Sequence, residues 1–288
     1  MNDDFDGFTV VSANIGLNWT ASNGDGFRFT YARGFNAPNL FRIGGQLIDA
    51  SATFPGFGGI GGNPLDEPEI SQQYEASWQR NLAGINGAVS ASLFSRTDDD
   101  IVRSAVSGFI FPSPSGLLYM GAGQVGSAET LGFEIELGGE TSAGFDWDLR
   151  YSYADTESDV ASQLPAGSIG VTANILPIFT LDYFDGRSSE HIFTATGPWT
   201  SDRYWVDGLV QYKSGYDSYA GAIALPGQTT ATSIDAVTVL NLTVGYEITD
   251  NLAFVVAGEG LLDDQRQEVI SVLSTADRRV WGALTWDF

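Results

Sequence analysis

The sequence predicts an all-β protein whose strands form an antiparallel up-and-down transmembrane β-barrel. Three observations support this fold class. Apolar and polar side chains alternate with a period of two in about eleven segments, short and long connections alternate between those segments, and no apolar run reaches the ~18 residues of a membrane helix. A strand crosses a bilayer with only about 9 to 11 alternating residues. The chain therefore has the pattern of a barrel that crosses a membrane with strands.

The clearest strand signal in the N-terminal part lies at residues 11–19. Successive side chains of a strand point to opposite faces, so every second residue shares a face. Here the apolar face carries Val11, Ala13, Ile15, Leu17 and Trp19. The same alternation predicts strands at 27–32, 74–79, 133–137, 146–153 and 240–246, and weaker forms of it predict strands near 87–96, 190–199, 203–214, 251–260 and 279–288.

The connections between these segments are of two kinds. Short links lie at 22–26, 81–87, 138–144, 197–203 and 247–251, and long ones at 35–69, 97–128, 155–189, 215–235 and 261–278. Their strict alternation places the tight turns at one end of the sheet and the long loops at the other, as in outer-membrane barrels. In YARGFNAPNLF, we expect a strand to end at Arg33 and Gly34, because the following Asn-Ala-Pro-Asn favours a turn.

The charged residues of these segments lie on the polar faces: Arg28, Glu75, Glu134, Glu136, Asp148, Arg150, Asp207 and Lys213. An Arg or Lys that faces the bilayer midplane costs about 2–4 kcal/mol, so the polar faces should line a wet or protein-filled lumen and the apolar faces should meet lipid. We predict Trp147, Leu149 and Tyr151 on the convex side of the sheet, with Asp148 and Arg150 on the concave side. The aromatic residues near the ends of apolar faces suit the membrane interfaces: Trp19, Trp78, Trp147, Tyr212, Tyr246 and Trp286.

Composition narrows the possible functions. The formal net charge of -23 disfavours binding to nucleic acid. The absence of cysteine excludes disulfides and thiolate chemistry, and a single histidine, His191, leaves no histidine-based metal cage without a partner chain. The opening MNDDFDGF is acidic and lacks the apolar run of a secretory signal. Either the protein is cytoplasmic or its true N-terminus lies upstream.

Two acidic motifs have both a chemical and a structural interpretation. Asp98, Asp99 and Asp100 offer oxygen ligands for Ca²⁺, but a charge run at the start of a loop is more often solvated. Glu134 and Glu136 share a strand face at a spacing that suits a carboxylate pair, but charges that line a wet lumen explain them better. We therefore expect no catalytic residue, no metal site and no cofactor, and we predict that the protein is not an enzyme.

Aromatic residues in the long connections are the candidate ligand contacts. We single out Phe57, Tyr119, Tyr216 and Tyr219, which could stack on a sugar or a siderophore. Packing of the loops on one another would account for aromatic residues there equally well.

Several motifs together resemble the C-terminal half of the barrel of a TonB-dependent outer-membrane receptor. YARGFNAPNLF resembles the family's strand-to-loop segment, and GNPLDEPEISQQYEASW resembles the start of its following strand. Further similarity lies in SASLFSRTDDDIV, in Gly132 and Glu134 of ETLGFEIEL, and in GEGLLDDQ before an aromatic-terminated last strand. Gly260 and Leu262 depart from the family, which often has Asn and Phe at those places.

The resemblance implies a 22-stranded barrel in the outer membrane, an N-terminal plug, and a segment that engages a TonB-type energising protein of the inner membrane. About eleven strands over residues 1–288 correspond to the C-terminal portion of such a barrel, without the plug. An odd number of strands cannot close as an antiparallel barrel of the usual bacterial kind. We therefore expect a fragment that needs the missing N-terminal barrel half, forms an open curved sheet alone, and aggregates or dimerises when expressed.

Two functions are compatible with the sequence. The first is part of an outer-membrane receptor that takes up a scarce small-molecule nutrient, such as a siderophore, a vitamin or an oligosaccharide. The alternative is a soluble or cell-surface β-sheet module that binds carbohydrate or acts as an adhesin, in which the acidic charge would serve solubility. Dependence on detergent separates the two, because a lipid-facing apolar band makes a protein insoluble in buffer.

Overall fold

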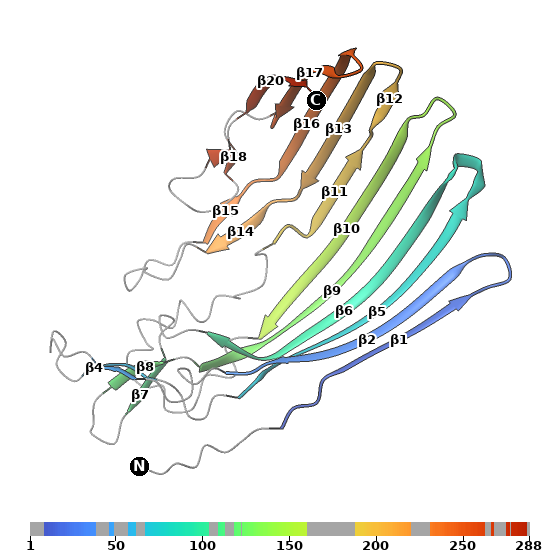
Figure 1. Ribbon diagram of the computed structural model, residues 1–288. Helices are drawn as coiled ribbons and strands as arrows, with labels where there is room; N and C mark the ends of the chain where they lie inside the picture. The colour runs from blue at the N-terminus through green and yellow to red at the C-terminus, as the bar shows by residue number, and fades with distance from the viewer. Residues whose placement is uncertain are drawn as a thin grey trace.

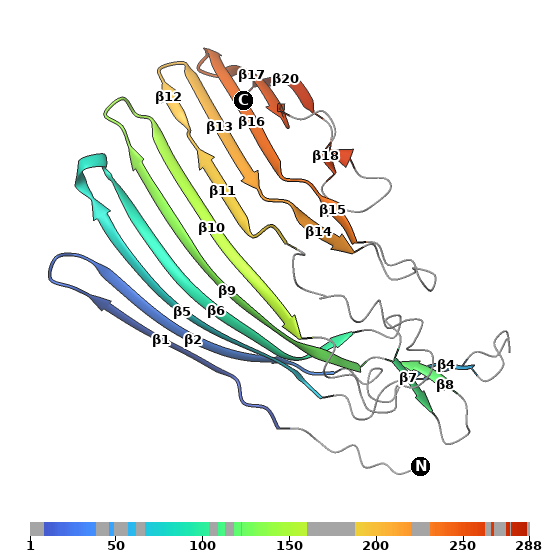
Figure 2. The same cartoon turned by 180° about the vertical axis from the view of Figure 1, so that it is seen from behind.

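The chain forms one large, curved antiparallel sheet with smaller sheets at one of its ends (Figure 1). The computed structural model describes residues 9–38, 46–48, 57–61, 67–103, 109–112, 118–121, 123–159, 188–219, 231–262, 266–267, 275–276 and 278–286. Figure 2 shows the same sheet from behind, with its strands side by side from one edge to the other. The sheet stays open, because β1 and β20 lie at opposite edges.

The large sheet follows the chain from strand to strand without a crossover, so the predicted meander is confirmed. Each pair of neighbours is antiparallel. Its eleven consecutive strands are β1 (Ala13–Thr20), β2 (Gly26–Asn36), β5 (Glu69–Leu82), β6 (Gly87–Arg103), β9 (Gly123–Glu140), β10 (Asp146–Asp159), β11 (His191–Thr196), β13 (Tyr204–Lys213), β16 (Val237–Thr249), β17 (Leu252–Glu259) and β20 (Arg279–Trp286). The short β12 (Trp199–Ser201) also pairs with β13.

The tight turns share one end of the sheet, as the lengths of the connections predict (Figure 1). Two of them have the same geometry. The Ala21 N–H donates to the Asp25 carbonyl and the Gly24 N–H to the Ala21 carbonyl, and Thr141, Phe145 and Gly144 repeat this arrangement. Gly24 and Gly144 have φ of 88° and 73°, a left-handed conformation that glycine adopts without steric cost. The glycine positions thus explain why these links turn so sharply.

The strands extend further toward the loop end than the sequence predicts. β2 does not end at Arg33 and Gly34 but continues to Asn36, whose partner is Glu69 on β5. Asp98–Asp100 does not begin a loop, because it lies inside β6, where Asp98 is paired with Ser71 and accepts a hydrogen bond from the Ser71 hydroxyl. Pairing with a neighbouring strand satisfies the backbone of these polar segments, so the ladder continues where the apolar alternation has already stopped.

Small sheets stand at the loop end. The largest has the order β3 (Gln46–Ile48), β4 (Phe57–Gly61), β8 (Leu118–Gly121) and β7 (Phe109–Pro112). Two others are the pairs β14 (Tyr216–Tyr219) with β15 (Ala231–Ile234) and β18 (Arg266–Gln267) with β19 (Thr275–Ala276). β4 and β8 run parallel, which differs from the expectation of antiparallel pairing throughout. This parallel pair joins the connection between β2 and β5 to the connection between β6 and β9, and the large sheet itself remains antiparallel.

The two faces of the large sheet separate as predicted on β10. Arg150 forms ion pairs with Asp148 and with Glu136 on β9, and the two carboxylates line a hollow of the concave side. Tyr151, on the opposite face by alternation, lies against Phe133 with a ring-centroid distance of 5.6 Å. The register along β9 and β10 is continuous, so this division holds from one end of the pair to the other.

The convex face has no protein layer over it within the described residues. Large apolar side chains on it are exposed, including Leu149 at 37% and Leu17 at 67%. Fully buried hydrophobic residues are few in the described ranges, and none of them is aromatic: Ile101, Ala128, Ile234, Val239 and Ala257. A water-soluble sheet covers an apolar face with a second layer, whereas a membrane barrel leaves it to lipid. The packing is therefore that of a sheet solvated by lipid on its convex side.

This division of faces predicts opposite effects of one charge on neighbouring positions. Ile135→Arg places a guanidinium on the convex face of β9, where Ile135 is 43% exposed, and should destabilise the folded protein in bilayers by about 2–4 kcal/mol. The control Glu134→Arg, on the concave face, should change stability by less than about 1 kcal/mol. Urea unfolding midpoints in lipid vesicles measure both. Equal losses for the two variants would contradict the face assignment.

A second prediction concerns Asp100, at the loop end of β6. Burial, followed by repulsion from Glu67 and Asp99, raises the pKa of its carboxyl above the ordinary value of 3.8. The folded state thus disfavours the ionised form, so the penalty is present above the raised pKa and is absent below 3.8, where both states are protonated. Asp100 also has φ of 57°, which asparagine tolerates.

Asp100→Asn should therefore raise the thermal unfolding midpoint at neutral pH, and the gain over wild type should disappear as the pH falls through the titration range. The control Asp250→Asn, in the exposed turn between β16 and β17, should leave the midpoint at neutral pH unchanged. A gain from Asp100→Asn that persists below the ordinary pKa would show that charge is not its cause.

Candidate functional site

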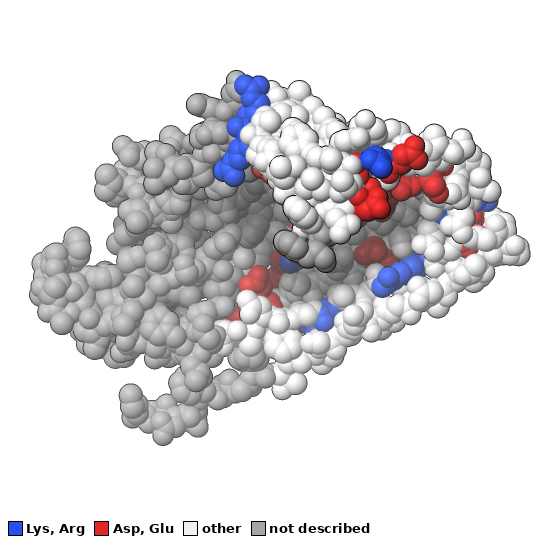
Figure 3. Space-filling model, turned by 45° about the horizontal axis from the view of Figure 1, so that its top comes forward, with Lys and Arg blue, Asp and Glu red and all other residues white. Residues whose placement is uncertain are grey.

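The concave side of the large sheet carries the polar and charged side chains. Figure 3 shows acidic residues, with some basic ones among them, along the hollow of the molecule. The side chains come from alternate positions of β5, β6, β9 and β10, which pair with one another over long registers. Because the register holds, polar positions of adjacent strands lie opposite each other and form a continuous wall. We call this surface the concave wall.

The clearest interaction on the concave wall joins three charges on β9 and β10. Arg150 Nε lies 2.6 Å from Asp148 Oδ1, and one of its terminal nitrogens lies 3.1 Å from Glu136 Oε1. Arg150 and Glu136 are direct cross-strand partners, whereas Asp148 is two residues earlier on the same face. The Arg150 side chain is 62% exposed, so solvent screens the pairs and they add little to stability. Their arrangement leaves a hydrated surface with both signs of charge.

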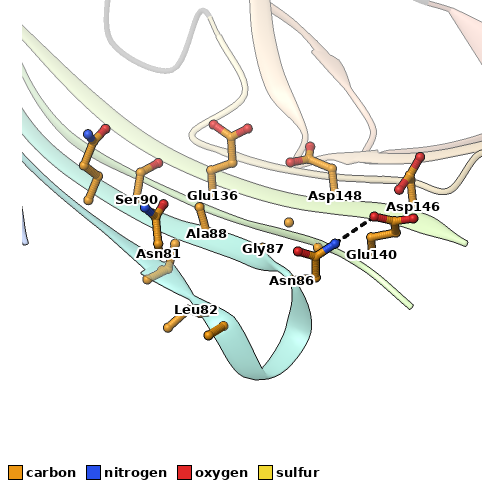
Figure 4. A pocket seen from close by; sticks show the side chains of 15 residues that line it. Asn81, Leu82, Asn86, Gly87, Ala88, Ser90, Glu136, Glu140, Asp146 and Asp148 are labelled. Carbon is orange, nitrogen blue, oxygen red and sulfur yellow. Dashed lines mark hydrogen bonds between the residues drawn. The ribbon is translucent and has the colours of Figure 1, made fainter. Parts of the chain in front are cut away.

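A hollow of about 870 Å³ lies on the concave wall toward the tight-turn end. In Figure 4, Glu136, Asp148 and Asp146 point into the same space from β9 and β10. Glu140 accepts a hydrogen bond of 2.8 Å from the Asn86 side-chain amide, which comes from the turn between β5 and β6. This end of the concave wall is thus rich in carboxylates.

A second hollow, of about 590 Å³, lies nearer the loop end and has a more mixed lining. There Arg96 forms an ion pair of 2.8 Å with Asp98 on β6. Phe94 lies over Gly132 of β9: a Cβ added to Gly132 would come within 2.4 Å of the Phe94 ring. Glycine at this position allows an aromatic ring to lie close to the wall. The hollow combines a cation, carboxylates and one aromatic surface.

The structure brings together no group of three His, Cys, Asp or Glu side chains that could hold a metal ion in the described ranges. His191 lies on the opposite face, where its Nδ1 is 2.8 Å from the Tyr151 hydroxyl and its ring packs on Tyr153. In the described part of the chain, no helix is long and apolar enough to cross a membrane. The described part of the concave wall presents polar and charged side chains to its hollows.

The predicted ligand contacts lie at the loop end, in two separate sheets. Phe57 is on β4 and Tyr119 on the neighbouring β8, where Tyr119 pairs with Gly59. Tyr216 and Tyr219 bound β14, in the sheet with β15. The side chains of Phe57, Tyr119 and Tyr219 lie outside the described part of the structure, and that of Tyr216 is half-buried. Whether these residues bind a ligand stays a prediction.

Alternation alone did not identify the partners on the concave wall. The sequence placed Arg150, Asp148 and Glu136 on polar faces but did not predict that they form one cluster, since that depends on the register between β9 and β10. The bond from Asn86 to Glu140 was likewise missed. Asn86 has φ of 44°, and Asn is among the residues that most readily adopt this turn conformation, so its position in a short link was the available signal.

Comparisons with known proteins agree with the fold. The family model for the β-barrel of TonB-dependent receptor-like proteins matches residues 2–260. The pyoverdine outer-membrane receptor FpvA from Pseudomonas aeruginosa superposes with a TM-score of 0.67 at 14% identity, over 96% of this chain and 36% of that one. The ferric-catecholate import receptor Fiu from E. coli gives 0.60 at 17% identity, over 95% and 34%. The FrpB iron transporter from Neisseria meningitidis gives 0.64 at 14%, over 96% and 39%.

The solved structures show similarity of fold, and this chain spans about a third of their length. No curated protein sequence matches the chain. The family model is the stronger finding, because it covers most of the chain and describes barrels of outer-membrane transporters, which are not enzymes. It agrees with the open antiparallel sheet, the apolar convex face and the charged concave wall. The chain belongs to the TonB-dependent receptor family, as part of its outer-membrane β-barrel.

Proposed function

We propose that this chain forms part of the barrel wall of a receptor that imports a scarce nutrient as a metal chelate of the siderophore class. The concave wall carries the proposal, because it offers a charged, polar lining to a passage. The similar solved structures include a receptor bound to pyoverdine, a ferric-catecholate import receptor and an iron transporter. These names favour metal chelates over vitamins and oligosaccharides.

The domain assignment is part of the same proposal. Residues 1–288 supply the C-terminal portion of the barrel, and the plug and the segment that engages a TonB-type protein belong to other parts of the receptor. The match to a barrel model over residues 2–260 supports this assignment. Energy coupling then reaches the concave wall through the plug, and the residues of this chain act by lining the passage and presenting loops.

The charge of the concave wall bears on the choice of cargo. Carboxylates at Glu136, Glu140, Asp146 and Asp148 surround the hollow near the tight turns, and the neighbouring cation, Arg150, is already paired. An acidic lining raises the local concentration of cations and lowers that of anions. We therefore propose that neutral or cationic chelates pass more readily than strongly anionic ones.

A soluble carbohydrate-binding module or adhesin is the less well supported function. It would need a covering for the exposed apolar residues of the convex face, of which Leu17 and Leu284 are 67% exposed. Transfer of apolar surface out of water is worth about 25 cal/mol per Å², so a bare face of this kind favours lipid over buffer.

Uptake experiments test the proposed cargo class. A receptor that contains this chain is expressed in a Gram-negative host without its own siderophore receptors, and growth under iron limitation is scored with neutral, cationic and anionic ferric chelates. We expect growth with a neutral or cationic chelate, dependent on an intact TonB-type protein. Uptake of a vitamin or an oligosaccharide with no ferric chelate taken up would overturn the cargo class and leave the transport function in place.

The loop aromatics generate a further prediction. The double variant Tyr216→Ala, Tyr219→Ala should raise the Kd for the transported chelate about tenfold or more, since loss of a stacked aromatic contact costs on the order of 1–2 kcal/mol. Tyr204→Ala, at the tight-turn end, is the matched control and should leave the Kd unchanged. Binding of a radiolabelled ferric chelate to whole cells measures both. An unchanged Kd in the double variant would remove these two residues from the candidate site.

A further inference from the structure

One aromatic side chain interrupts the polar face of β6. Ser90, Ser92, Arg96 and Asp98 alternate on the concave side of this strand, and Phe94 lies among them. Phe94 lines the hollow of about 590 Å³ near the loop end, and it is the one aromatic residue among the described residues of that lining. Its side chain is half-buried, so part of the ring is open to the hollow. A half-exposed apolar ring among polar neighbours marks Phe94 as a candidate ligand contact.

Gly132 on β9 sets the position of this ring. The two residues are direct cross-strand partners. A Cβ added to Gly132 would lie 2.4 Å from the Phe94 Cζ and 2.5 Å from the Tyr153 carbonyl oxygen, so a side chain there would push the ring away. Gly132 does not have a positive φ, so its backbone conformation does not require glycine. The glycine therefore provides space, and the Phe94 ring lies against the backbone of β9 with its other face toward the hollow.

Polar groups border the ring on the neighbouring strands. Thr130 and Glu134 lie two residues to either side of Gly132, on the same face of β9. The Thr130 hydroxyl is 2.9 Å from the Thr156 hydroxyl on β10. Because one proton lies between these two oxygens, the pair keeps a second hydroxyl proton to donate and lone pairs to accept. The ring thus has a pair of hydroxyls on one side and a carboxylate on the other.

The charges near the ring restrict the charge of a ligand. Arg96 forms an ion pair of 2.8 Å with Asp98, so its positive charge is already compensated. Glu75, the cross-strand partner of Phe94 on β5, lines the hollow together with Glu134. These carboxylates repel an anionic group, whereas a neutral hydroxyl can donate a hydrogen bond to a carboxylate oxygen. A cationic group would use the carboxylates and leave the threonine hydroxyls unused.

We propose that Phe94 is the platform of a subsite on the concave wall that takes an uncharged phenolic ring. The ring of the ligand lies in an offset stack on the open face of Phe94, and its hydroxyl group donates to the Glu134 carboxylate. The subsite is separate from the loop aromatics, because it lies on the large sheet. The inference rests on the proposed function, in which cargo moves along the concave wall, and it adds the chemical class of one group that the cargo carries.

Trp205 and Gly245 have the same packing outside the two hollows. They are cross-strand partners on β13 and β16, and a Cβ added to Gly245 would come within 2.1 Å of the Trp205 ring. Neither residue lines the hollow near the loop end or the one near the tight turns. This pair therefore provides a matched control, because it has an aromatic ring over a glycine without the polar border of a ligand site.

Binding of two matched probes tests the subsite. A receptor that contains this chain is reconstituted in lipid nanodiscs, and saturation-transfer NMR measures the Kd values of 4-methylphenol and 4-methylcyclohexanol, with empty nanodiscs as the blank. The probes share their hydroxyl and methyl groups and differ in the aromatic ring, so we expect the phenol to have the lower Kd. Phe94→Leu should raise the Kd of the phenol about three- to tenfold, because the aromatic pair is lost, and should leave that of the cyclohexanol within about twofold.

Variants of the two glycines separate the position of the ring from its presence. Gly132→Ala should raise the Kd of the phenol by a similar factor although Phe94 is intact, because the added Cβ displaces the ring. Phe94→Trp should keep the affinity for the phenol. The controls Trp205→Leu and Gly245→Ala should leave both Kd values unchanged. Phe94→Leu introduces no such clash and decides the matter if Gly132→Ala does not fold.

Three results would overturn the subsite: no binding of 4-methylphenol above the blank, an unchanged Kd in Phe94→Leu, or an equal rise in Trp205→Leu. Each of them is independent of the uptake of ferric chelates. Growth on a chelate without a phenolic group would leave the proposed function in place, and the Kd of the phenol would still decide whether Phe94 forms a subsite.

Discussion

The pairing of the backbone between strands is the constraint on which the rest of the structure depends. A lipid environment offers no hydrogen bonds, so each N–H and C=O of a membrane strand needs a partner on the next strand. This requirement explains the long registers between β5, β6, β9 and β10, and the same ladder continues past the apolar part of β6 to Arg103. The ladder of backbone hydrogen bonds stops at β1 and β20, so these two strands form the edges of the large sheet.

Alternation predicted the parts of the fold that depend on neighbours in sequence. Trp147 to Arg150 divided between the two faces as expected, because the direction of a side chain follows from the pleat of its own strand. The end of β2 at Asn36 and the parallel pair of β4 and β8 were not predicted. Both depend on which distant segment lies alongside, and a single strand's pattern contains no information about that.

The candidate site also combines features that follow from local sequence with features that depend on distant segments. The loop aromatics were expected at one end of the barrel, and the lengths of the connections were sufficient for that. Their distribution over two small sheets required the pairings of β4 with β8 and of β14 with β15. On the concave wall, the sequence predicted that Arg150 and Glu136 lie on polar faces. Their 3.1 Å ion pair depends on the register of β9 against β10, which the sequence did not predict.

The parallel pair of β4 and β8 ties together two connections that are separate in sequence. β4 belongs to the connection between β2 and β5, and β8 to the connection between β6 and β9. A sequence change in one of these external segments therefore alters the surface against which the other is hydrogen-bonded. Grafting either segment alone into another receptor would leave β4 or β8 paired only with its hairpin neighbour, so the two segments form one exchangeable unit. Selection for new specificity, or for escape from antibodies and phages, would be expected to act on both segments jointly.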